Sequence, residues 1–226
     1  IAFLLPIFWM FASYYLEVSR NLEFVHQERL GVQYAKSVYT ALDHAATWRY
    51  QVRSSTTSSN SATNEAKSQF DVTFKDLESL NNKLGSTLAN STQFEQTRQS
   101  LILAQSDKLS AEETYKAHTA LFQNLITLID KTTDGSGLAL DPDLQSYYLM
   151  SAILMRGPEI IQNTSHLRGL GRNALNAKQL SPQLAAEIQQ HLSVMEHELS
   201  LALRDFEKVK QVAPNYFSKI ETNATE

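Results

Sequence analysis

The chain has 226 residues, a net charge of −4, no cysteine, and only 7 glycines and 5 prolines. Without cysteine it forms no disulfide, no thiolate metal site and no cysteine nucleophile. The small acidic excess gives no electrostatic basis for binding nucleic acid. Glycine and proline are the residues of tight turns, so their scarcity argues against an all-β fold and a glycine-rich phosphate loop. The composition predicts an all-α protein with long helices.

Residues 1–16 (IAFLLPIFWMFASYYL) carry no charged side chain. A membrane-spanning helix needs about 20 apolar residues, so we expect this stretch to be the outer part of a truncated first transmembrane helix. Trp9, Tyr14 and Tyr15 fit the aromatic belt at a membrane boundary. Two alternatives are open. A cleaved signal peptide would have a basic start, and an ordinary buried helix would have a polar face.

The first helix is expected to continue beyond Glu17 without a break. Mostly apolar or small residues recur along it at alternating steps of four and three, which is the pattern of a coiled-coil seam. This first seam consists of Gly31, Ala35, Val38, Leu42, Ala45, Arg49 and Val52. Residues 54–64 (SSTTSSNSATN) predict a loop, because their side chains compete with helical backbone hydrogen bonds.

Several further helices follow from caps and breaks. A helix whose apolar side includes Phe70 and Phe74 is expected to end near Gly85, and Ser91 or Thr92 to cap a short continuation. Residues 110–113 (SAEE) form a capping box that opens the next helix. Residues 133–138 (TDGSGL) end that helix, because they hold two glycines in a polar run.

The last third of the chain predicts two long helices. Asp141 and Pro142 start the first of them, and residues 157–158 (GP) kink it. Residues 181–182 (SP) start the second, which Pro214 bends. Its seam consists of Ile188, Leu192, Met195, Leu199, Ala202, Phe206 and Val209. Together the elements predict an elongated up-down bundle of the four-helix type with long, kinked helices, forming one domain over residues 17–226.

No motif predicts an enzyme, a cofactor or a metal. The six histidines do not form the helical pairs that hold metal ions, and no nucleophile or phosphate-loop motif is present. His118 lies on an apolar stripe, where a buried histidine satisfied by a hydrogen bond is expected.

Two arginines depart from ordinary bundle packing. Arg49 lies on the first seam and Arg168 on the inward stripe of a later helix, where an unpaired charge costs several kcal/mol. Each arginine either pairs with an acidic residue of the bundle, or extends to water. The alternative is a pocket for a small anion between helices, with aromatic walls and hydroxyl groups. Its predicted ligand-binding residues are Arg49, Arg168, Tyr34, Tyr147, Tyr148 and Ser146.

Three short stretches add a resemblance. Residues 27–34 (QERLGVQY), 141–150 (DPDLQSYYLM) and 167–171 (LRGLG) resemble motifs in the extracytoplasmic sensor domains of four-helix-bundle methyl-accepting chemotaxis receptors. One subgroup has His-Arg-Gly near the end of its first helix, whereas this chain has Trp48, Arg49 and Tyr50 there. The motifs cover about thirty residues, and related sensor domains also occur in histidine kinases and diguanylate cyclases.

The resemblance implies a periplasmic ligand-sensing domain anchored in the bacterial inner membrane. It also implies a homodimer, for which the small residues Gly31, Ala35 and Ala45 would allow close approach of a second copy. The output is open between a chemoreceptor and a kinase or cyclase, and sensing is open between direct contact and a periplasmic binding protein. A third hypothesis is a membrane-anchored structural coiled coil with no ligand.

Overall fold

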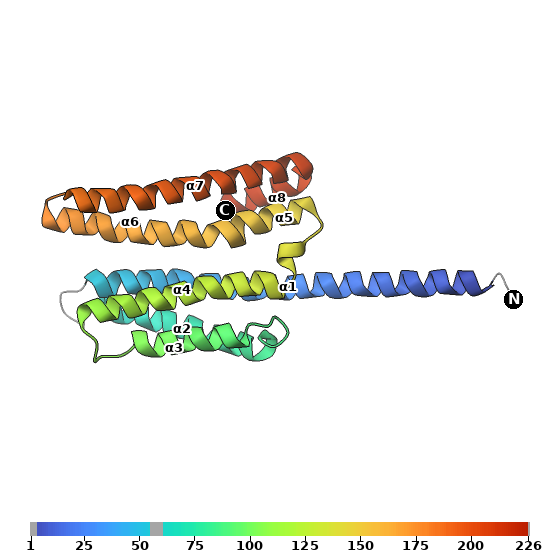
Figure 1. The fold of residues 1–226 in the computed structure, drawn as a ribbon, viewed down its shortest axis with the longest axis horizontal. Helices are drawn as coiled ribbons and strands as arrows, with labels where there is room; N and C mark the ends of the chain where they lie inside the picture. Colours follow the sequence, from blue (N-terminus) through green and yellow to red (C-terminus); the bar gives the residue numbers. More distant parts are fainter. Residues whose placement is uncertain (1–3, 55–60, 226) are drawn as a thin grey trace.

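The computed structural model describes residues 4–54 and 61–225, and within them it is built of helices (Figure 1). These are α1 (Leu4–Ser54), α2 (Ser61–Leu84), α3 (Ser91–Ala104), α4 (Ala111–Gly135), the short 3₁₀ helix η1 (Leu138–Leu140), α5 (Leu144–Met150), the π-helix η2 (Ser151–Arg156), α6 (Gly157–Ala177), α7 (Pro182–Val212) and α8 (Pro214–Thr225). The all-α bundle predicted from composition and periodicity is confirmed.

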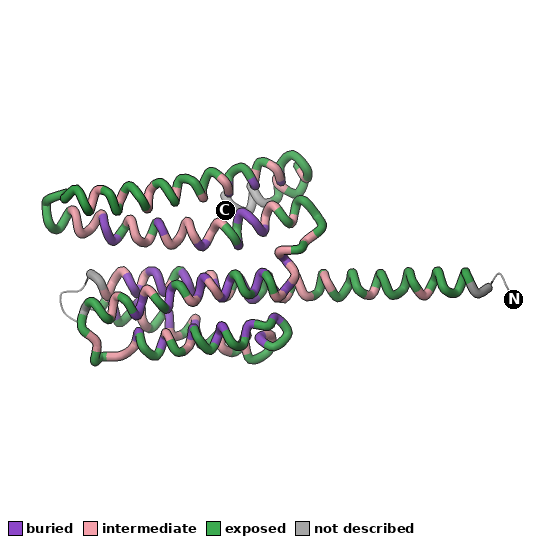
Figure 2. The backbone as a smooth tube through the Cα atoms, viewed as in Figure 1, coloured by how far each residue is buried: buried purple, intermediate pink, exposed green. Residues whose placement is uncertain are grey.

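Helix α1 is a single helix of 51 residues, which confirms the expected continuation past Glu17. Its first part projects beyond the other helices and leaves its apolar side chains exposed (Figures 1 and 2). In the described part of the chain, no helix combines the length and the apolar character needed to cross a membrane.

The second part of α1 packs with α2, α3 and α4 into a four-helix bundle that holds most of the buried residues (Figure 2). Its first seam lies in this core: every position from Gly31 to Arg49 is buried, and Val52 packs against them. Phe70 stacks on Phe74 within α2, and Phe74 stacks on Phe94 from α3. The seam is therefore the contact face of α1 within its own subunit.

A second group of helices lies against α1 and α4. Helices α5, η2 and α6 follow one another along one helical path, and α7 runs back beside them, with α8 turning back beside α7 (Figure 1). The seam expected on α7 is only partly buried: Ala202 and Val209 are buried, whereas Leu199 is exposed. Helix α7 packs on the path from α5 to α6 and on α8, and these neighbours leave Leu199 exposed.

The helix boundaries agree with some predicted caps and correct others. The capping box of Ser110 and Glu113 is present, and the second long helix starts at Ser181 and Pro182 as expected, with the Ser181 side chain as its N-cap. Asn90 is the N-cap of α3, so the assignment to Ser91 or Thr92 is wrong. Residues 61–64 are helical rather than part of the predicted loop, whose residues 55–60 lie outside the described residues.

The helix expected to start at Asp141 and Pro142 begins later, at Leu144. Asp141 Oδ1 accepts a hydrogen bond from the backbone N–H of Asp143 at 2.8 Å. This local turn holds the backbone of both residues outside the helical region, so Asp143 becomes the N-cap.

The three small residues that were expected to face a second copy are used inside the subunit. A Cβ atom on Gly31 would collide with the side chain of Ser136, and Ala35 and Ala45 are buried in the core. The prediction that these residues form a dimer interface is therefore wrong. Small side chains allow close approach to any neighbouring helix, and here the neighbours belong to the same chain.

Candidate functional site

Arg49 lies where α1, α4 and α6 meet, and only 3% of its surface is exposed. Its Nη2 donates a hydrogen bond to Ser165 Oγ of α6 at 2.8 Å. Its guanidinium lies over the Phe122 ring of α4, 4.2 Å from the ring centre, which is a cation–π contact. The prediction that Arg49 points into the bundle is confirmed. The first seam places it there, because it follows Ala45 at a step of four.

His118 lies beside this arginine and is almost fully buried, which confirms the expected burial and leaves the expected hydrogen bond a prediction. Its ring meets the Trp48 ring edge-on, with the two ring centres 4.3 Å apart. Burial, with a further contribution from the Arg49 charge, lowers the pKa of His118 to about 4. At neutral pH the site therefore holds one positive charge next to a neutral imidazole. We call Trp48, Arg49, His118, Phe122 and Ser165 the Arg49 site.

Arg168 lies close to the same end of α1, but on the surface. Its side chain is exposed, and its guanidinium carbon lies 4.1 Å from the centre of the Tyr50 ring. Its Nη2 donates to the Ala46 carbonyl oxygen at 3.2 Å. Arg172 lies over the same ring at 5.2 Å. The expectation that Arg168 points into the core is therefore wrong, because α6 contacts α1 with only part of its surface and Arg168 lies at the edge of that contact.

The tyrosines predicted to complete the pocket lie elsewhere. Tyr34 is fully buried and donates to Asn81 Oδ1 of α2 at 2.8 Å. It precedes Arg49 on α1 by about 22 Å, at 1.5 Å per residue. Tyr147 is exposed in the middle of α5 and packs edge-on against Tyr148, with ring centres 5.6 Å apart.

The remaining two predicted residues are also remote from Arg49. Tyr148 is covered by Lys208 of α7, whose Nζ lies 4.5 Å from the ring centre, and Ser146 donates to the Asp143 carbonyl oxygen at 3.2 Å. The structure thus brings only Arg49 and Arg168 into one region of the six residues. The pocket prediction assumes that residues on inward stripes meet at one place. Residues on one stripe are instead spread along the helix axis.

Four members of the Arg49 site were not predicted as site residues: Trp48, His118, Phe122 and Ser165. His118 and Phe122 are separated by four residues on α4, which places them on one face. Ser165 is a small polar residue four positions after Ile161, which packs against the core. A polar side chain on the core-facing side of a helix is the one sequence feature that could have indicated Ser165. It does not reveal which helix lies opposite.

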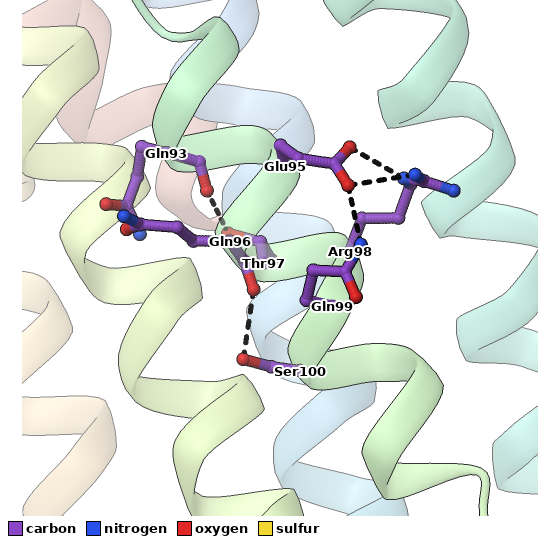
Figure 3. Close-up of polar contacts among 7 residues, drawn as sticks. All are labelled: Gln93, Glu95, Gln96, Thr97, Arg98, Gln99 and Ser100. Carbon is purple, nitrogen blue, oxygen red and sulfur yellow. Dashed lines mark hydrogen bonds and ion pairs between the residues drawn. The ribbon is translucent and has the colours of Figure 1, made fainter.

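Several polar contacts of the described residues lie within a single helix. Figure 3 shows them on α3, where Thr97 and Ser100 hydroxyls donate to backbone carbonyls one turn earlier, and Arg98 donates two hydrogen bonds of 2.8 Å to Glu95. These bonds, above all the one from Arg98, lower the pKa of the exposed Glu95 to about 2. Among the described residues, no group of three or more His, Asp or Glu side chains is arranged to hold a metal ion.

Comparison with known proteins gives no match: no family model fits the chain, and neither a curated sequence nor a solved structure is significantly similar to it. The Arg49 site is therefore interpreted from its own chemistry. A buried guanidinium next to a hydroxyl, a neutral imidazole and aromatic faces is suited to binding an anion.

Proposed function

We propose that this chain is the extracytoplasmic ligand-sensing region of a bacterial inner-membrane receptor, and that the receptor serves chemotaxis. In this proposal a small anion binds at the Arg49 site, between helices, and shifts them relative to one another. The observation that carries the proposal is the continuity of α1, which joins an exposed apolar segment at one end to the buried Arg49 at the other.

The position of Arg49 supports the choice of ligand class. Charge-assisted hydrogen bonds to a carboxylate or another oxyanion are roughly twice as strong as neutral ones. An anion that takes the place of the Ser165 hydroxyl at Arg49 would remove a contact between α1 and α6. A ligand that prefers one packing of the two helices shifts the equilibrium between packings, which is the physical basis of a signal.

The exposed start of α1 supports a membrane location. Between Ile7 and Leu16 its large apolar side chains are exposed, including Trp9 with 75% of its surface accessible. Exposed apolar surface of this extent is typical of contact with a membrane or a partner. In the Trp48→Phe variant Trp9 is the remaining tryptophan, so its emission should shift to shorter wavelength with lipid vesicles. The Trp9→Phe variant, which reports on buried Trp48, should not respond.

A second exposed pattern on α1 supports a homodimer through a different face from the one predicted. Residues at alternating steps of three and four are all exposed: Phe8, Phe11, Tyr15, Val18, Leu22, Val25, Arg29 and Val32. A repeat of 3.5 residues on an uncovered helix face is the pattern of a coiled coil. We assign this outer seam to contact with a second copy in parallel orientation. In two copies anchored in one membrane, the outer seam lies at the same distance from the membrane.

A second candidate function is a structural helical bundle without a ligand. It is favoured by one observation: Arg49 and Arg168 both have hydrogen-bond partners within the chain, Ser165 and the Ala46 carbonyl. The kinase or cyclase output and sensing through a binding protein remain alternatives to chemotaxis, and they share the proposed input.

A thermal-shift screen separates the two candidates. The full chain in detergent is melted with carboxylates, amino acids, phosphate, sulfate and nitrate. A ligand at one hundred times its Kd stabilises by about 2.7 kcal/mol, so an authentic ligand should raise Tm by about 5 °C or more. The rise should disappear in Arg49→Lys and persist in the control Arg20→Lys, which changes an exposed arginine on α1. If no anion raises Tm, the structural bundle is the better interpretation.

A further inference from the structure

The helical path from α5 to α6 contains a wide turn. Ser151–Arg156 is π-helical, whereas Leu144–Met150 before it and Gly157–Ala177 after it are α-helical. A π-turn accommodates one more residue than an α-turn, and such turns occur frequently at functional sites. Closing it to α geometry would turn α5 against α6 by about 100°, the rotation of one residue in an α-helix.

One hydrogen bond from α1 holds the wide turn from one side. The Tyr39 hydroxyl donates to the backbone carbonyl oxygen of Ile153, inside η2. Gly157 makes room for this contact: a Cβ atom there would lie 2.5 Å from the Tyr39 hydroxyl oxygen. Since the acceptor is a backbone atom of the π-turn itself, the bond depends on the π geometry rather than on the identity of the side chain at 153.

Helix α7 holds the same turn from the other side. Ser151 Oγ donates to Asp205 Oδ2 at 2.7 Å, and both residues are buried. Arg156 Nη1 contacts Glu198 Oε2 at 3.2 Å, with both side chains partly exposed. The first and last residues of η2 are thus both tied to α7, and a rotation of α5 against α6 must break at least one tie.

We propose that η2 is a two-state register switch that Tyr39 holds in the π state. When α1 shifts against α6, the Tyr39 hydroxyl leaves the Ile153 carbonyl, the wide turn closes to α geometry, and Ser151 separates from Asp205 on α7. The switch thereby connects the α1–α6 contact at Arg49 to α7, and its operation by a ligand rests on the proposed function. None of the residues in the switch belongs to the Arg49 site.

The first test asks whether the two places are coupled, using backbone amide hydrogen exchange of the full chain. Ser165→Ala removes the hydroxyl that Arg49 contacts. It should raise exchange at residues 151–157 at least fivefold, although it lies eight or more residues away. The control Asn176→Ala changes an exposed residue further along α6 and should leave the exchange of that segment unchanged. Equal exchange in the two variants would overturn the proposal.

The second test removes the extra residue. Deleting Ile153 should convert η2 to α-helix while α5 and α6 stay in phase, so the protein should melt within a few degrees of the parent. Deleting Thr164 from the regular part of α6 should lower Tm much more, because it rotates everything after it. In the Ile153 deletion, Ser165→Ala should no longer change exchange at the junction. If the two deletions lower Tm equally, the claim that η2 holds one extra residue is contradicted.

The hydrogen bond from Tyr39 to the Ile153 carbonyl is tested by Tyr39→Phe and Gly157→Ala. Each should raise exchange at residues 151–157, and the double variant should do no more than either alone, because both remove the same bond. Additive effects would show that Gly157 acts independently of Tyr39. None of these experiments uses a ligand. A failed anion screen would therefore refute the proposed function, whereas the switch is tested separately by hydrogen exchange and melting.

Discussion

The guanidinium of Arg49 lies 4.2 Å from the centre of the Phe122 ring. The positive charge near the end of α1 thus lies on an aromatic face of α4, while its Nη2 donates to Ser165 on α6. One side chain therefore joins the four-helix bundle to the helices that follow it.

Arg49→Lys should destabilise the fold even though the charge is kept. A lysine ammonium is a point charge on a flexible stem and does not reproduce a planar group that stacks and donates at once. A hydrogen bond to a charged group contributes about 1.5–3 kcal/mol, so the free energy of unfolding should fall by about that amount. Urea denaturation measures it, with Arg20→Lys as the exposed control. A difference below about 0.5 kcal/mol between the variants would contradict the assigned contacts.

Stability should fall as the pH is lowered from about 6.5 to about 4. The folded-state pKa of His118 is about 4, below the ordinary histidine pKa of about 6.5, so the unfolded chain binds a proton in this window and the folded chain does not. This proton uptake costs on the order of 3 kcal/mol. Urea unfolding at pH 4.5, 5.5 and 7 should show a shallower slope in His118→Gln than in the control His197→Gln, which changes an exposed histidine. Identical slopes of unfolding free energy against pH in the two variants would refute the role of His118.

Two glycine substitutions should act in opposite directions. A Cβ atom on Gly135 would collide with the Leu88 carbonyl oxygen, so Gly135→Ala should destabilise. Nothing lies within 4 Å of a Cβ atom on Gly171, so Gly171→Ala should gain helix propensity, up to about 1 kcal/mol. Thermal melting of the two variants checks the prediction. A stabilised Gly135→Ala would mean that the turn before α3 is not packed as described.

Cysteine crosslinking in membranes locates the dimer interface, because the parent chain has no cysteine. Leu22→Cys or Val25→Cys should form disulfides between copies, since both positions are exposed on the outer seam. Ala35→Cys should not, because Ala35 is buried within its own subunit. Crosslinking at Ala35 with none at Leu22 and Val25 would place the partner on the other face.

The sequence carries enough information for the helices and little for their assembly. The seam from Gly31 to Arg49 was identified by its spacing, because a buried helix face must repeat with the helical period. The capping box at Ser110 and the helix start at Ser181 and Pro182 were identified because their chemistry is local. The start of α3 was missed, since Asn90, Ser91 and Thr92 are all acceptable N-caps and packing selects among them.

The candidate site shows the same limit. Arg49 was identified because a charge on a core stripe is conspicuous, whereas its partners Phe122 and Ser165 lie 73 and 116 residues further along the chain. Which helices meet there depends on long-range packing, which no local spacing encodes. The wide turn at η2 was also missed. A one-residue insertion is invisible in a single sequence, because only the neighbouring helices show that a residue is in excess.

The length of α1 has a mechanical consequence. Trp9 and Arg49 lie on the same unbroken helix, and at 1.5 Å per residue their separation along the axis is about 60 Å. A stiff rod of that length acts as a lever: a tilt of about 1° around Arg49 displaces Trp9 sideways by about 1 Å. The first part of α1 projects beyond the other helices (Figure 1), whereas the part from Gly31 to Arg49 is packed in the bundle core, so the tilt is set by that packed part and carried outward by the free part. Angular changes too small to disturb the packing around Phe122 are thereby converted into displacements of atomic size at the far end.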